Sequence, residues 1–166
     1  MTRRLVALFT VLAGLLGLGQ VAQAACVLGE PGATRAVAMG PAHRTVQIHL
    51  PRGFDPARPA PRVFLLHGSG GTGASMLASS GLAQAADRHG FIVAAPDGGI
   101  PVERGFVWNV PGVPTITGAV PGPDDADDVA FLLSVIDDLA AQGCVDDSRV
   151  YATGLSGGGR MTSWLA

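Results

Sequence analysis

Ser156 is the residue whose surroundings best fit a chemical role. It stands at the centre of Gly154-Leu155-Ser156-Gly157-Gly158, and the pattern G-x-S-x-G is typical of a strained turn between a strand and a helix that exposes a nucleophilic serine. The β-branched and aromatic residues before the turn predict a strand, and a helix is expected after it. Free backbone N–H groups at the start of that helix favour negative charge nearby. We therefore expect acyl transfer through Ser156, with the N–H of Gly157 stabilising the oxyanion. The alternative is a glycine-rich turn with a solvated serine.

A second glycine-rich loop, residues 67–73, directly follows the apolar run 63–66. In one interpretation it is an oxyanion loop, in which the backbone N–H of Ser69 supplies the second donor and His67 supports the loop without acting as the base. In the other, residues 68–73 are a literal G-x-G-x-x-G, the dinucleotide-binding pattern. Asp97, after the next predicted strand, lies further along than the ribose-binding acid of that pattern. The first interpretation requires no cofactor and no metal.

These two loops need a framework, and the chain predicts one of alternating strands and helices. Strands are expected over residues 45–50, 63–66 and 91–95, with a helix over 75–89 and a second that begins in the acidic run 124–128. We interpret the carboxylates of that run as helix-capping groups, with a metal cluster as the less favoured alternative. Residues 96–123 form a long loop, in which Trp108 either lines the site or anchors the loop. The predicted class is α/β, with a mostly parallel sheet and helices on both faces.

The N-terminus has the pattern of an export signal. Arg3 and Arg4 precede an apolar stretch that ends at Leu18, and Ala22-Gln23-Ala24 supplies a small-x-small cleavage pattern. We expect residues 1–24 to be a signal peptide and residues 25–166 to be the exported part, so the protein would be secreted or periplasmic, with no membrane association after cleavage. A retained membrane anchor and lipidation of Cys26 are the alternatives. The formal net charge is −2, without a basic run, which disfavours nucleic-acid binding.

The sequence contains two cysteines, Cys26 and Cys144. In an oxidising compartment they form an even pair with no other partner. We expect a disulfide between them, which would tie the exported N-terminus to the segment before the strand that leads to Ser156. Two buried free thiols are the alternative.

Several motifs in order resemble a known enzyme family. They are Leu65-Leu66-His67-Gly68 with its loop, residues 86–93, Pro96-Asp97-Gly98, Trp108-Asn109, residues 127–132 and residues 145–161. Together they resemble the secreted α/β-hydrolase esterases that include feruloyl esterases and poly(3-hydroxybutyrate) depolymerases. The resemblance implies that Ser156 is the nucleophile and that Gly157 and the loop after His67 form the oxyanion hole. It also implies a paired cysteine before the nucleophile strand, and substrates that are carboxylic esters, including polymeric ones.

One departure from the family concerns the catalytic base. Family members carry an Asp and then a His after the serine, whereas this sequence has neither between Ser156 and Ala166, and its histidines are at positions 43, 49, 67 and 89. A serine without its base is a poor nucleophile. We therefore expect this sequence to be the N-terminal part of a longer α/β-hydrolase catalytic domain whose C-terminal part is missing. The alternative is a non-catalytic truncated or binding protein of the same fold.

Overall fold

The computed structural model describes residues 28–166. Within them the main sheet has the strand order β1-β2-β4-β3-β7. Its strands are β1 (Thr34–Met39), β2 (Arg44–His49), β3 (Ala60–Leu66), β4 (Ile92–Pro96) and β7 (Val145–Gly154). A small hairpin, β5 (Ile100–Pro101) and β6 (Phe106–Val107), stands apart from it. The helices are α1 (Gly73–Ser80), α2 (Leu82–His89), α3 (Asp128–Ala141) and α4 (Gly157–Leu165).

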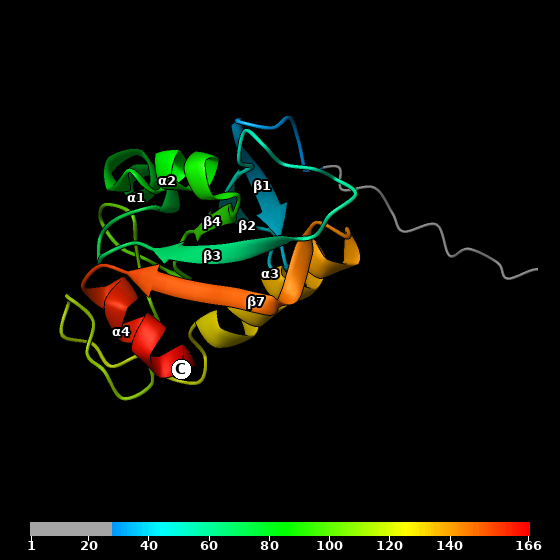
Figure 1. Ribbon diagram of the computed structural model, residues 1–166. Coiled ribbons are helices and arrows are strands. Elements are labelled where there is room, and N and C mark those ends of the chain that lie inside the picture. Colours follow the sequence, from blue (N-terminus) through cyan, green and yellow to red (C-terminus); the bar gives the residue numbers. More distant parts are fainter. Residues whose placement is uncertain (1–27) are drawn as a thin grey trace, which may run out of the picture.

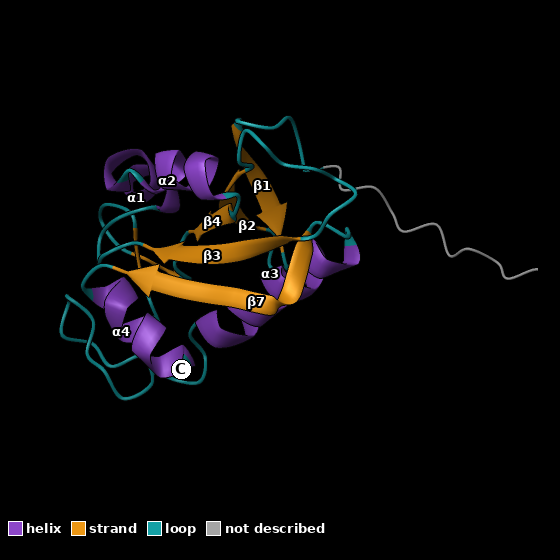
Figure 2. Cartoon of the chain, in the orientation of Figure 1, coloured by secondary structure: helices purple, strands orange, loops and turns teal. Residues whose placement is uncertain are grey.

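Helices cover both faces of the sheet, as the sequence predicts (Figures 1 and 2). On one face, α1 and α2 bury Leu77 and Ala86 against Leu65 and Val93. The other face is the larger core, where α3, α4 and the apolar side chains of β2, β3 and β4 pack together. The continuous apolar runs of β3 and β4 are what a strand buried on both faces requires.

The pairing of the strands divides the sheet into two parts. Strands β4, β3 and β7 are parallel to one another, whereas β1 pairs with β2 and β2 with β4 in the antiparallel sense. Strand β1 was not predicted from the sequence. The expectation of helices between all strands also fails here, because β1, β2 and β3 follow one another without a helix.

The single helix expected over residues 75–89 is two helices. Gly81 has φ 69° and ψ 6°, the left-handed conformation, and separates α1 from α2. Glycine adopts this conformation without a steric penalty, so it stops one helix and allows the next to begin. The helix also begins earlier than predicted, since Thr72 and not Ser75 is the N-cap of α1.

None of the helices in residues 28–166 is long and apolar enough to cross a membrane. The predicted signal peptide, residues 1–24, and Cys26 lie outside the described residues.

Candidate active site

The turn between β7 and α4 holds Ser156 in an uncommon backbone conformation. Ser156 has φ 51° and ψ −112°, outside the regions that non-glycine residues normally occupy. Its side chain is exposed at the tip of the turn. The backbone fixes this geometry on both sides, because Leu155 N–H donates to Leu66 O at 3.1 Å and Gly158 N–H donates to Leu155 O at 2.9 Å. A strained residue held by its neighbours in this way is typical of a functional position.

The glycines around Ser156 allow close approach of backbone to backbone. A Cβ on Gly158 would collide with the carbonyl groups of Leu66 and His67, and one on Gly154 would collide with the backbone of Gly158. Since these contacts are with backbone atoms, they cannot be relieved by a side-chain rotation. The sequence pattern around Ser156 therefore has a direct steric reason.

Ser69 lies beside Gly157, as the oxyanion interpretation requires. A Cβ placed on Gly157 would be 2.5 Å from Ser69 Oγ and 3.4 Å from Ser69 N. Among residues 28–166, neither Ser69 N–H nor Gly157 N–H has a hydrogen-bond acceptor. Two free backbone donors thus flank the position next to Ser156, where the oxygen of a tetrahedral intermediate would need them.

His67 supports the loop that carries Ser69. Its side chain is buried, its Nδ1 lies 2.8 Å from Gly68 O, and its Nε2 accepts a hydrogen bond from Gly98 N–H at 2.9 Å. These partners place the proton on Nδ1, because the carbonyl needs a donor and the N–H needs an acceptor. Burial is the main cause that lowers the pKa of His67. A neutral imidazole with both nitrogens engaged braces the backbone and is not placed to act as a base.

Trp108 anchors the long loop to this support and so settles one of the alternatives left by the sequence. Its Nε1–H donates to His67 O at 2.8 Å, and its ring centroid lies 4.7 Å from that of His67. Hydrogen bonds between Gly70 N–H and Phe106 O and between Phe106 N–H and Gly71 O join the glycine loop to β6. The loop is therefore fixed by backbone hydrogen bonds to β6 and by the buried side chains of His67 and Trp108.

Asp97 and Asp128 complete the scaffold behind the loop. Asp97 Oδ1 accepts a hydrogen bond from Gly73 N–H at 2.7 Å, at the start of α1. Arg44 Nη2 donates to Asp97 O at 2.6 Å and to Asp128 Oδ1 at 2.5 Å, and Asp128 Oδ2 also accepts from Asn109 N–H. Burial raises the pKa of Asp128, and the Arg44 charge opposes that shift. Both carboxylates thus accept hydrogen bonds from backbone N–H groups of the loops and hold these loops in place.

The acidic run 124–128 divides into separate roles. Asp127 is the N-cap of α3 and accepts a hydrogen bond from Ala130 N–H at 2.9 Å, as the capping interpretation predicts. Asp128 instead is buried beside Arg44, a pairing between distant segments that the local pattern does not reveal.

A cavity of about 500 Å³ opens beside the oxyanion loop. Its lining combines Ser69 and Gly70 with charged and apolar side chains from residues 102–104 and 116–117, including Arg104 and Ile116. Ile116 is 64% exposed, so its apolar side chain is open to contact with a bound group. The cavity is therefore the candidate place for a substrate group next to the reacting atoms.

No side chain in the described part of the chain is hydrogen-bonded to Ser156 as a general base would be. Among residues 28–166 no hydrogen bond reaches Ser156 Oγ. His67 is engaged as above, and His49 is buried in a hydrogen-bonded chain between Thr34 and Asp87. His49 therefore has a structural role.

A sheet in the order β1-β2-β4-β3-β7 with a serine at the tip of the β7–α4 turn defines the class of α/β-hydrolases. Within that class the chain belongs to the esterase family whose model, described as "Putative esterase", matches residues 38–161.

Individual relatives agree with this assignment. The chain is 35% identical over 123 residues to feruloyl esterase B of Piromyces equi, covering 73% of this chain and 21% of that protein. It is 37% identical over 134 residues to a protein of Nocardia uniformis subsp. tsuyamanensis named "Putative esterase NocK", covering 80% of this chain and 36% of the relative. The solved structure of acetyl xylan esterase from Aspergillus awamori superposes with a TM-score of 0.61 at 23% identity, over 81% of this chain and 46% of that one. The chain thus spans less than half the length of each of these proteins.

Proposed function

We propose that this protein is a secreted serine esterase that hydrolyses carboxylic esters through an acyl-enzyme on Ser156. One observation carries the proposal: Ser156 is held at φ 51° at the tip of the β7–α4 turn, beside the free N–H groups of Ser69 and Gly157. The match of residues 38–161 to the esterase family supports the same reaction.

In the proposed mechanism each of these groups has one role. Ser156 Oγ attacks the ester carbonyl carbon while a general base takes the hydroxyl proton, and the carbonyl oxygen becomes an oxyanion that accepts from Ser69 N–H and Gly157 N–H. Collapse of this intermediate breaks the bond to the alcohol, which leaves with the proton. Water then attacks the acyl-serine by the same route, releasing the acid and restoring Ser156.

The base is expected outside this sequence. We propose that residues 1–24 are a signal peptide and that residues 25–166 are the N-terminal part of a longer catalytic domain, which supplies the triad Asp and His. Two observations support this proposal. The relatives of this chain are much longer than the region that they share with it. In addition, His67 and His49 are already engaged in structural hydrogen bonds.

The substrate is proposed by analogy with the named relatives. Feruloyl and acetyl esters of polysaccharides fit the names of the feruloyl esterase and the acetyl xylan esterase, and a polyhydroxyalkanoate-type polyester is the other candidate. The cavity beside Ser69 offers both Ile116 and Arg104, so it can contact an apolar acyl group and a polar one.

A disulfide between Cys26 and Cys144 is also proposed. Cys144 is fully buried directly before β7, and Cys26 lies outside the described residues. Titration of thiols in the denatured, unreduced protein should find none, and two reactive thiols would refute the pairing.

Labelling with a fluorophosphonate tests the reaction. The protein as secreted by its source should be labelled at Ser156, and Ser156→Ala should abolish labelling and the turnover of a small aryl ester. Ser163→Ala, which removes another exposed serine from α4, is the matched control and should retain both. If the folded secreted protein is not labelled, the alternative of a non-catalytic binding protein of the same fold takes precedence.

A further inference from the structure

A second cavity adjoins the one beside the oxyanion loop. It has a volume of about 220 Å³. Val102, Glu103 and Thr117 line both this cavity and the larger one that contains Ser69, so the two spaces are neighbours. The second cavity does not include Ser69 but extends to Asp125. A substrate that reacts at Ser156 therefore has room to continue beyond the oxyanion donor.

The turn over residues 102–105 forms part of the wall of both cavities and is fixed to the oxyanion loop. Val102 N–H donates to Gly105 O at 3.1 Å, and Gly105 has φ 70°. A Cβ on Gly105 would collide with the carbonyl oxygens of Gly70 and Gly71, so the turn packs directly on that loop. The side chains at the tip of the turn are therefore held close to the proposed site of reaction.

Glu103 and Arg104 bring opposite charges to the cavity beside Ser69. Both residues are exposed, and neither side chain has an ion-pair or hydrogen-bond partner among residues 28–166. A substrate group of either charge would be attracted by one of them and repelled by the other. A neutral hydroxyl group suits both, because it donates to a carboxylate and accepts from a guanidinium.

The second cavity adds polar groups at fixed positions. Asp125 Oδ2 accepts a hydrogen bond from Gly122 N–H at 2.7 Å, whereas Asp125 Oδ1 has no partner within residues 28–166. The hydroxyl oxygens of Thr115 and Thr117 are 2.8 Å apart, and Thr115 N–H donates to Ala119 O. Polar groups that are already ordered lose less entropy when they bind a ligand. This lining favours a chain that carries many hydroxyl groups.

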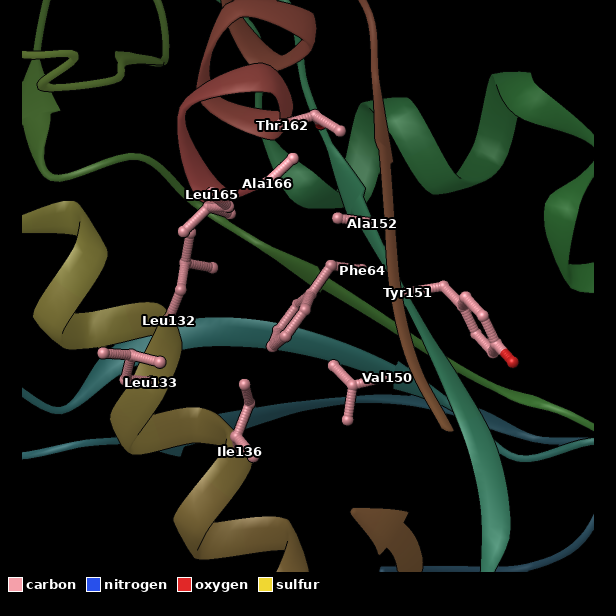
Figure 3. A pocket seen from close by; sticks show the side chains of 10 residues that line it. All are labelled: Phe64, Leu132, Leu133, Ile136, Val150, Tyr151, Ala152, Thr162, Leu165 and Ala166. Atoms are coloured by element: carbon pink, nitrogen blue, oxygen red, sulfur yellow. The ribbon is translucent and has the colours of Figure 1, made fainter. Parts of the chain in front are cut away.

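The apolar groove between β7, α3 and α4 offers no comparable lining. It has a volume of about 370 Å³, and in Figure 3 Phe64, Val150 and Ile136 point into it. None of the 10 side chains that line it is charged. The hydroxyl group of Thr162, which is one of them, already donates to Gly158 O at 2.9 Å. Binding of a hydroxyl-rich chain is therefore better supported beside the oxyanion loop.

We propose that Glu103 is a specificity-determining residue, and that the two cavities form one groove for the carbohydrate part of the ester. Hydroxyl groups of a neutral sugar chain donate to Glu103 and Asp125 and accept from Arg104. A hydroxyalkanoate polyester has no hydrogen-bond donor except its terminal hydroxyl, so it would desolvate both carboxylates without compensation. The proposal rests on the proposed function, because it concerns the substrate of that reaction, and it favours polysaccharide esters over the polyester.

The test uses the protein as secreted by its source and compares esters that share an acetyl group. Acetylated xylo-oligosaccharide has a hydroxyl-rich alcohol part, whereas p-nitrophenyl acetate does not. Glu103→Gln should lower kcat/KM on the oligosaccharide about fivefold to tenfold, mainly through KM, because an amide is a weaker acceptor than a carboxylate. On p-nitrophenyl acetate the change should stay below about twofold. Glu30→Gln, which changes an exposed carboxylate outside the groove, is the matched control and should leave both values within about twofold.

Binding provides a second readout that needs no turnover. In the Ser156→Ala protein, calorimetric titration with the same oligosaccharide should show a Kd that Glu103→Gln raises by about fivefold to tenfold and that Glu30→Gln leaves unchanged.

Three outcomes would overturn the proposal: an equal loss on both esters, no loss on the oligosaccharide, or faster hydrolysis of a hydroxybutyrate trimer than of the oligosaccharide. Failure of the proposed function gives a different result. It would abolish fluorophosphonate labelling and the turnover of both esters before Glu103 is changed, while the titration would still report on the groove.

Discussion

The strain at Ser156 can be measured by comparing two substitutions at that position. Ser156→Ala removes only an exposed hydroxyl without a hydrogen bond in the described chain, whereas Ser156→Gly also relieves the backbone, which stands at φ 51° and ψ −112°. A non-glycine residue in such a conformation costs about 1–3 kcal/mol. Glycine gives back about 0.5–1 kcal/mol because its unfolded chain is more flexible. We therefore expect the Gly variant to be about 0.5–2 kcal/mol more stable than the Ala variant.

Urea denaturation of the two variants measures this difference in the free energy of unfolding. Ser163 on α4 provides the matched control, because it is exposed and helical. There the sign should reverse, with Ser163→Gly less stable than Ser163→Ala by about 1 kcal/mol. If Ser156→Gly is no more stable than Ser156→Ala, the turn is not strained and the inference from its backbone angles fails. Both variants at Ser156 should be inactive, because neither has the serine hydroxyl. A more stable but inactive Gly variant would indicate that the strained backbone serves to position that hydroxyl.

Three further predictions concern the supports of the turn. Gly158→Ala should destabilise the protein by at least about 2 kcal/mol, measured by urea denaturation, because its Cβ would collide with Leu66 O; a loss below about 0.5 kcal/mol would refute the close approach. His67→Phe should cost about 2–4 kcal/mol, because it leaves Gly98 N–H buried without an acceptor, whereas His89→Phe at the exposed end of α2 should change stability by less than about 0.5 kcal/mol. Since burial lowers the pKa of His67, the unfolded chain is protonated at a higher pH than the folded protein. The contribution of this group to stability is therefore complete above about pH 6.5 and falls as the pH decreases, by at most about 1.4 kcal/mol per pH unit. His67→Phe should flatten the plot of stability against pH between about pH 5 and 6.5, and parallel plots for the two proteins would contradict this.

The parts of the site that the sequence predicts are those with a local cause. The turn around Ser156 has room for no Cβ atom at Gly154 or Gly158, and the sequence has glycine at both positions. The serine lies at the tip of this strand-to-helix turn, as the pattern predicts. The capping role of Asp127 was also predicted, because the acceptor and the N–H of Ala130 are three residues apart. Signals of this kind need no knowledge of what lies across the sheet.

The parts that the sequence did not predict depend on segments far apart in the chain. Arg44 and Asp128 form a buried pair, and His49 is paired with Asp87. In both pairs the sequence around each residue contains no pattern that predicts its partner. The division of the predicted helix at Gly81 was missed for another reason, since the apolar spacing continues across the break and only the positive φ of Gly81 reveals it. Tertiary contacts and backbone angles decide these features.

The site itself combines both kinds of information. The loop with Ser69 and the turn with Ser156 can each be predicted, but their meeting depends on β3 and β7 being parallel neighbours, with Leu66 and Gly154 as register partners at the ends of the two strands. The carboxyl ends of adjacent parallel strands necessarily open at the same edge of a sheet. The hydrogen bond from Leu155 N–H to Leu66 O then fixes the turn directly against the loop. A shift of this pairing would move the N–H of Ser69 away from Ser156 while leaving both motifs intact, so the proposed chemistry depends on the register of the two strands as much as on the serine.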